Sequence, residues 1–204
     1  MSYQSLIFHW AEQQNAFTGL VLLGLGACYT LQGFRFARVL MGLASAVMAV
    51  AFLGAWTDAW IALLAGVAVG LLAVAAGGLG LIIASTLTFA AMGYYLAAQI
   101  GLPIEAVAVA ALVGGLAGVV APRFYRRTLP LILTSLHGSA VLIISFVCLA
   151  GACLPSMAET FISWSASISF MAPTALLLFV VTGLSVQLNA RQGDIETGGS
   201  GGIA

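Results

Sequence analysis

Long runs of apolar residues recur along the whole chain, and they constrain its fold more than any other feature. Several of them reach the roughly 18 residues that indicate a transmembrane helix. Only 6% of the 204 residues are charged, whereas soluble domains carry about 25%. Because backbone groups in lipid must be hydrogen-bonded internally, the runs predict helices. The composition therefore excludes a soluble globule and predicts an all-α integral membrane protein.

The apolar runs predict seven transmembrane helices between two flanking segments. The expected transmembrane domain covers residues 15–190, with spans at about 15–33, 39–55, 61–76, 79–100, 106–121, 128–152 and 168–190. Residues 1–14 resemble a short interfacial segment, because apolar and aromatic side chains dominate their centre. Residues 154–167 predict a loop on the membrane surface. The Gly- and Ser-rich stretch 191–204 predicts a disordered cytoplasmic tail.

The charges indicate how the seven helices are oriented. Basic residues favour the cytoplasmic side of a membrane. With an external N-terminus, seven spans place all six arginines in the cytoplasm: Arg35, Arg38, Arg123, Arg126, Arg127 and Arg191. The acidic residues Glu12, Asp58, Glu105 and Glu159 then lie outside, and Asp194 and Glu196 lie in the cytoplasmic tail. We therefore expect a multi-pass protein of the cell inner membrane with a cytoplasmic C-terminus.

The chain also has an internal periodicity. Small residues at Gly33, Gly77 and Ala121 recur at intervals of 44 residues, each at the end of a predicted span. Arg-Phe-x-Arg sequences follow near the first and third of these positions. The pattern predicts three consecutive helical hairpins in the same orientation, followed by a seventh helix.

Polar side chains inside the spans are the candidate functional residues. Among the histidine, acidic and basic residues, His137 alone lies well inside a predicted span. It lies about 15 Å along the helix from Arg127. Ionisable groups at such depth are functional candidates. Other polar residues at comparable levels are Thr134, Ser135, Ser85, Thr86, Thr88, Ser45, Thr182 and Gln187. They could line a polar path, or they could hydrogen-bond neighbouring helices.

Glycine pairs and arginine clusters suggest partners. Gly66 with Gly70, and Gly114 with Gly118, have the spacing that lets helices approach closely. This packing could be internal, or it could support a homo-oligomer or a contact with another membrane protein. The arginine clusters could serve orientation alone, bind anionic lipid headgroups on the cytoplasmic face, or dock a partner. The zero net charge indicates no nucleic-acid partner.

The sequence lacks the usual signatures of catalysis. It contains no HExxH or GxSxG motif and no paired intramembrane aspartates, and its three cysteines have no metal-binding spacing. We therefore expect a non-enzymatic protein without metal or cofactor. The favoured function is a structural or assembly component. The alternative is a channel or facilitator for small neutral or weakly charged solutes, with its polar path near His137.

Three short motifs carry a family resemblance. They are Gly33-Phe34-Arg35-Phe36 after the first span, Thr134-Ser135-Leu136-His137-Gly138-Ser139-Ala140 in the sixth, and Gly183-Leu184-Ser185-Val186-Gln187 in the seventh. Together they resemble the transmembrane protein 198-like family (domain of unknown function 4203) over roughly residues 15–192. The resemblance implies a seven-helix multi-pass membrane protein and supplies no catalytic residues. His137 departs from the pattern of the sixth helix in that family.

Overall fold

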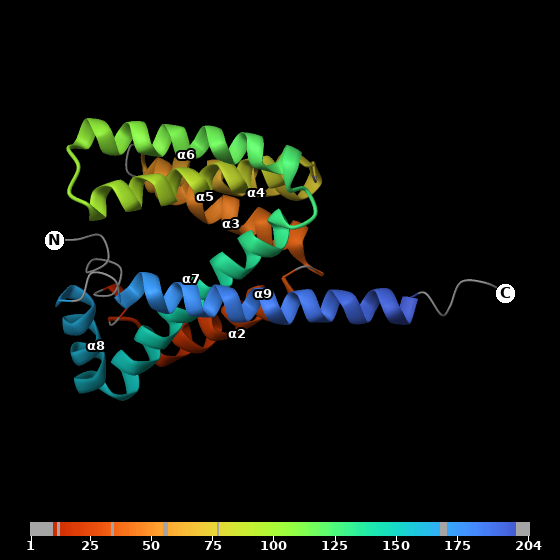
Figure 1. Ribbon diagram of the computed structural model, residues 1–204. Coiled ribbons are helices and arrows are strands. Elements are labelled where there is room, and N and C mark those ends of the chain that lie inside the picture. The colour runs from red at the N-terminus through yellow and green to blue at the C-terminus, as the bar shows by residue number, and fades with distance from the viewer. Residues whose placement is uncertain are drawn as a thin grey trace. The chain divides into compact units, whose positions relative to one another are not determined.

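The computed structural model describes residues 10–11, 13–33, 35–54, 57–76, 78–167 and 171–198. Within these ranges the regular secondary structure is entirely helical. The helices labelled in Figure 1 are α2 (Ala16–Gln32), α3 (Ala37–Gly54), α4 (Ala59–Ala75), α5 (Gly78–Gln99), α6 (Ile104–Phe124), α7 (Leu129–Cys153), α8 (Pro155–Ser167) and α9 (Met171–Gly198).

Four helical segments of the described residues are long and apolar enough to cross a membrane. They are α5, α6, α7 and the Pro173–Ala190 part of α9. Three shorter helices are also apolar: Ala16–Gln32, Ala37–Val50 and Ala59–Ala75. The predicted all-helical class is confirmed, and these apolar helices are compatible with a membrane protein.

Local sequence signals explain where several helices begin and end. The Asn15 side chain accepts a hydrogen bond from the Thr18 amide at 2.8 Å and caps α2. Gly101 adopts a positive φ of 73° in the turn after α5, a conformation that glycine tolerates best. Pro103 is the N-cap of α6. At the weak break predicted from Gly77-Gly78, α4 ends at Ala75 and α5 begins at Gly78.

Two segments differ from the expectation. Residues 154–167, predicted as a loop, contain helix α8, which starts at Pro155, a residue that suits the first helical turn. The tail predicted to be disordered from Arg191 continues α9 to Gly198, because Arg, Gln and Glu in this stretch are good helix formers. Residues 1–9 and 12 of the predicted interfacial segment and 199–204 of the tail lie outside the described residues.

The chain divides into two compact units. The first comprises residues 1–35 and 134–204, and the second comprises residues 36–133. Helix α7 begins in the second unit, and its residues from Thr134 onward belong to the first.

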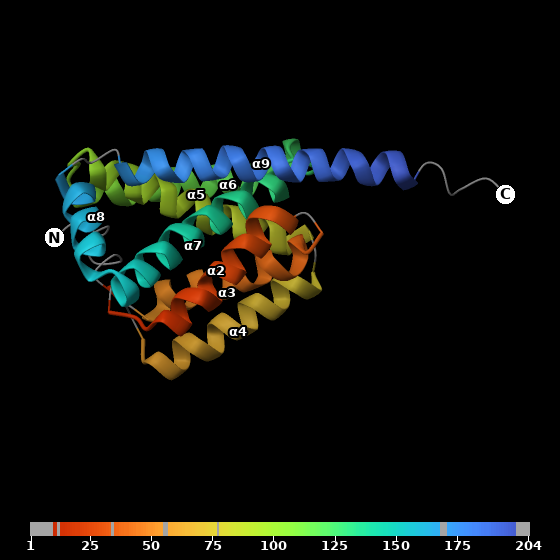
Figure 2. The same cartoon turned by 90° about the horizontal axis from the view of Figure 1, so that it is seen from below.

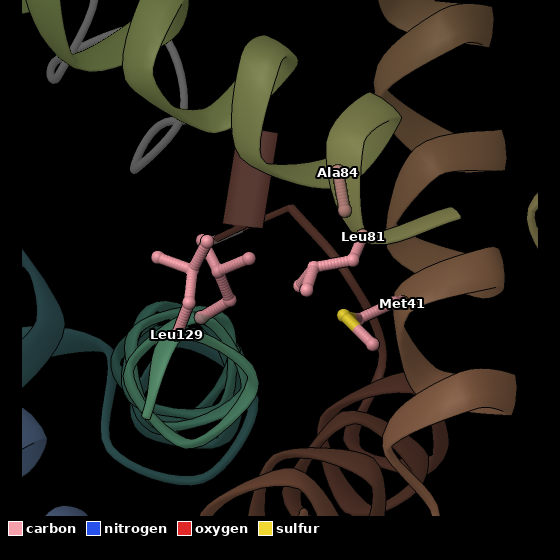
Figure 3. Close-up of a cluster of buried hydrophobic side chains, with 5 residues drawn as sticks. Met41, Leu81, Ala84 and Leu129 are labelled. Atoms are coloured by element: carbon pink, nitrogen blue, oxygen red, sulfur yellow. The ribbon is translucent and has the colours of Figure 1, made fainter. Parts of the chain in front are cut away.

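In the second unit, α3 packs along α4 and α5 packs along α6, as both views show (Figures 1 and 2). Both pairs are antiparallel: Gly66 lies against Val50 and Gly42 against Val74, whereas Gly118 lies against Ser85 and Gly93 against Ala110. A hydrophobic core joins α3 and α5 to the first two turns of α7 (Figure 3). It consists of Met41, Leu81, Ala84, Leu129 and Leu133.

These contacts group the helices differently from the predicted 44-residue hairpins. The predicted repeat pairs α2 with α3, α4 with α5, and α6 with α7. In the structure the closest pairs of the second unit are α3 with α4 and α5 with α6, and α4 packs less extensively on α5. The cause is the position of the glycines, since those of α4 face α3 and those of α6 face α5.

In the first unit, α2 lies antiparallel to the later part of α7. Gly19 of α2 lies against Leu149, and Gly26 lies against Leu142. A core of Ala11, Ile143, Val147 and Cys148 is extended by partly buried residues of α2, α8 and α9. Glycines thus allow α2 to approach α7 closely.

Two glycines of α2 provide a matched pair for testing this contact. A β-carbon at Gly26 would lie 2.9 Å from Leu142 Cγ, whereas one at Gly24 would meet nothing within 4 Å. We expect Gly24→Ala to be neutral or stabilising by up to about 1 kcal/mol, because alanine favours helix formation. Gly26→Ala should instead destabilise the protein by about 1 kcal/mol through overpacking. Unfolding in mixed micelles of mild detergent and SDS measures both, and equal effects would contradict the close approach.

Candidate functional site: a buried polar cluster

Polar side chains from three helices of the first unit meet in one buried place. We call Thr30 of α2, Thr134, Ser135 and His137 of α7, and Gln187 of α9 the polar cluster. Thr134, Ser135 and Gln187 are fully buried, and Thr30 is nearly so. A buried polar group is costly unless it is hydrogen-bonded, so the bonds of these residues indicate what the cluster does.

Gln187 is the centre of the polar cluster. Its Nε2 donates to the backbone oxygens of Tyr29 at 3.1 Å and Thr30 at 3.0 Å. Its Oε1 accepts from the Thr134 hydroxyl at 3.2 Å. The Thr30 carbonyl lies in the last turn of α2, where carbonyls lack partners within the helix. One amide of α9 therefore caps α2 and binds α7.

Ser135 makes a second contact between α7 and α9. Its hydroxyl donates to the Val180 carbonyl oxygen at 2.8 Å. Gly183, one helical turn further along α9, leaves no room for a side chain, since a β-carbon there would lie 2.5 Å from Ser135 Oγ and 2.6 Å from Thr30 Cγ2. The absence of a side chain at Gly183 thus lets three helices meet at these hydroxyls.

His137 lies at the edge of the polar cluster. It is partly buried, and its ring packs edge-on against Tyr29, with centroids 6.5 Å apart and an angle of 66° between the ring planes. The next residue, Gly138, contacts the backbone and side chain of Thr30. His137 therefore belongs to the contact between α7 and the end of α2.

The remaining predicted polar residues do not join this cluster. Ser85, Thr86, Thr88 and Ser45 belong to the second unit. Thr182 is exposed on α9 and donates to the Leu178 oxygen of its own helix at 2.9 Å. The structure thus brings together four of the nine predicted residues, namely His137, Thr134, Ser135 and Gln187.

In the second unit, the hydroxyl of Ser85 also joins two helices. The buried Ser85 hydroxyl lies 2.6 Å from the Gly118 oxygen of α6 and 2.7 Å from the Leu81 oxygen of its own helix. Thr88 donates to Ala84 at 2.7 Å. Among the described residues, the buried oxygens Ser45 Oγ and Thr86 Oγ1 have no hydrogen-bond partner.

The contribution of α2 to the polar cluster was not predicted from the sequence. Tyr29 and Thr30 contribute backbone oxygens to Gln187, and an acceptor of this kind leaves no trace in the residue type. A usable signal was present in Gly138 and Gly183, because each stands within four residues of a predicted polar residue and marks close approach.

The glycine pairs and arginines of the sequence prediction occupy distinct places. Gly66 and Gly70 contact α3, whereas Gly114 and Gly118 contact α5. Arg35, Arg38, Arg123, Arg126 and Arg127 are exposed, and the Arg191 side chain lies outside the described ones. The described residues contain no group of three or more His, Cys, Asp or Glu that could hold a metal ion.

Comparisons with known proteins do not extend this picture. No protein-family model, curated protein or solved structure matches the chain. The residues and contacts of the chain itself therefore have to indicate its function.

Proposed function

We propose that the chain is a non-enzymatic, seven-span protein of the cell inner membrane that serves as a structural or assembly component. In this proposal its helices pack with further copies of the chain or with another membrane protein. The N-terminus lies outside and the C-terminus in the cytoplasm. The similarity of three motifs to the transmembrane protein 198-like family agrees with this proposal.

The observation that carries the proposal is the use of the polar side chains. Gln187, Ser135 and Ser85 each form a hydrogen bond with a neighbouring helix. Groups occupied in this way join helices and are not available to bind a passing solute. Their arrangement favours a packing function over a solute path.

The charges of the second unit support the proposed orientation. Because its neighbouring helices alternate in direction, Arg38 at the start of α3 lies at the same end of the unit as Arg123 near the end of α6. Asp58 and Glu105, which precede or begin α4 and α6, lie at the other end. This separation is what the positive-inside rule requires of a cytoplasmic and an external side.

Exposed apolar side chains provide surfaces for assembly. On α4, Ile61, Leu64, Leu71 and Leu72 are exposed, while Gly66 and Gly70 face α3. Such side chains suit either lipid tails or a neighbouring helix. They support self-association or binding to another membrane protein.

The alternative is the channel or facilitator with a polar path near His137, and the observation in its favour is that this titratable ring is only partly buried at the edge of the polar cluster. For a packing function, we expect His137→Ala to lower stability by about 1 kcal/mol, because the ring contact with Tyr29 is lost. Flux of small solutes into proteoliposomes should not change. Stopped-flow light scattering measures this flux with water and glycerol as solutes.

The control for this experiment is His137→Phe, which keeps an aromatic ring beside Tyr29 and removes both ring nitrogens. Flux that falls in a folded Phe variant would favour the channel and contradict the packing function. Native mass spectrometry of the same wild-type preparation should show more than one copy or a co-purified membrane protein. A lone monomer in native lipid would argue against assembly.

A further inference from the structure

An apolar groove lies beside the second arginine cluster, within the second unit. It has a volume of about 440 Å³ and is lined by α5, α6 and the start of α7. The lining residues are Phe89, Ala117, Val120, Ala121, Phe124, Tyr125, Leu129 and Ile132. Its outer walls are open, since Val120, Phe124 and Tyr125 are at least half exposed. Pockets of about 300–1,000 Å³ are large enough for a ligand.

Positive charge is concentrated at one end of this groove. Arg123, Arg126 and Arg127 are exposed, and they flank the lining residues Phe124 and Tyr125 in the chain. The acidic residue of α6, Glu105, lies 18 residues before Arg123, or about 27 Å along the helix. The groove therefore has an apolar part, which we call the trough, and a cationic end.

We propose that this groove binds an anionic glycerophospholipid, with an acyl chain in the trough and the phosphate at the arginines. This inference rests on the proposed insertion in the membrane. Arginine binds phosphate oxygens in a bidentate geometry, and an exposed tyrosine suits the level of the headgroups. A free phosphate would leave the apolar trough unfilled. A zwitterionic lipid would offer less attraction to three arginines.

Native mass spectrometry of the full chain tests this binding. The probes are phosphatidylglycerol and phosphatidylcholine with identical acyl chains, added in equal amounts to delipidated protein in detergent. We expect phosphatidylglycerol to bind at least tenfold more tightly. Replacing Arg123 and Arg126 together by glutamine should abolish this preference, since each basic residue contributes about a fivefold factor near an anionic lipid.

The trough is tested with a second variant. Ala117 is exposed and lines the groove, so Ala117→Phe fills the trough without entering the hydrophobic core. We expect it to reduce phosphatidylglycerol binding at least tenfold. Ala108→Phe is the matched control, because Ala108 is exposed on the same helix, outside the lining residues and about 180° around the helix axis.

Two further controls test the loss of arginine charge and the insertion of the chain in the membrane. The Arg35→Gln/Arg38→Gln variant removes the same charge at the other cluster and should retain the preference for phosphatidylglycerol. Equal binding of both lipids, an unaffected Ala117→Phe variant, or displacement of the lipid by soluble glycerol phosphate would each overturn the inference. Extraction of membranes with alkaline carbonate tests the insertion itself. If it releases the chain, the proposed function is overturned as well. If the chain is inserted in the membrane but does not select between the two lipids, only the proposed lipid binding in the groove is overturned.

Discussion

Replacing Gly118 by alanine is expected to separate α5 from α6 and to destabilise the second unit by about 1–3 kcal/mol. A β-carbon at this position would lie 2.5 Å from the backbone oxygen of Ser85 and 2.6 Å from Thr86 Cα. Both atoms belong to the backbone, so no change of side-chain conformation relieves the overlap. The shift would also stretch the 2.6 Å bond between the Ser85 hydroxyl and the Gly118 oxygen. These losses outweigh the gain of up to about 1 kcal/mol in helix propensity.

Gly115 provides the control for this experiment on the same helix. A β-carbon there would lie 3.6 Å from Ala90 Cβ, which is ordinary van der Waals contact. Gly115→Ala should therefore be neutral or slightly stabilising. Loss of helical circular dichroism with added SDS measures both variants. If Gly118→Ala does not unfold at a lower SDS concentration than Gly115→Ala, the result contradicts the close contact between α5 and α6.

The helices could be predicted from the sequence because apolar length has a direct physical cause. A backbone surrounded by lipid must bond to itself, so each long apolar run has to be helical whatever it packs against. Even the weak break at Gly77-Gly78 corresponds to two separate helices, α4 and α5. The helical extension beyond Arg191 was missed because its Gly- and Ser-rich end suggested a flexible tail.

The polar cluster could be predicted only in part, because residue type does not reveal the face of a helix. Thr182 and Gln187 are five residues apart on α9, so their side chains point about 140° apart. Gln187 is fully buried, whereas Thr182 is exposed and bonds to its own helix. Deciding between them requires the rotation of α9 against α2 and α7, which depends on the fit at Gly183.

The predicted hairpin repeat shows a related limit. Its interval was read from Gly33, Gly77 and Ala121, which follow the ends of helices. The pairing of helices depends instead on glycines within them, such as Gly42 and Gly70 between α3 and α4. Glycine in a turn supplies conformational freedom, whereas glycine on a helix face supplies room for a neighbour. A period counted over both kinds mixes two different causes.

Replacing Gln187 by leucine is expected to destabilise the first unit by about 2 kcal/mol. The change keeps a side chain of similar size and removes three hydrogen bonds, two to backbone oxygens of α2 and one to Thr134 of α7. Bonds between membrane helices contribute about 0.6 kcal/mol each on average, which gives the expected total. The Thr30 carbonyl would lose the donor from α9 in a buried place where water cannot replace it. Unfolding with SDS in mild detergent measures the effect.

Asn189→Leu is the matched control, since it also replaces an amide by leucine on α9. Asn189 is exposed and lies about 200° around the helix from Gln187, so its loss should change stability by less than about 0.5 kcal/mol. A double-mutant cycle of Gln187→Leu with Thr134→Val then isolates the contact between α9 and α7. We expect a coupling of about 0.6 kcal/mol. Equal destabilisation by the two leucine variants would show that Gln187 does not join the three helices, and the main support for a packing function would be lost.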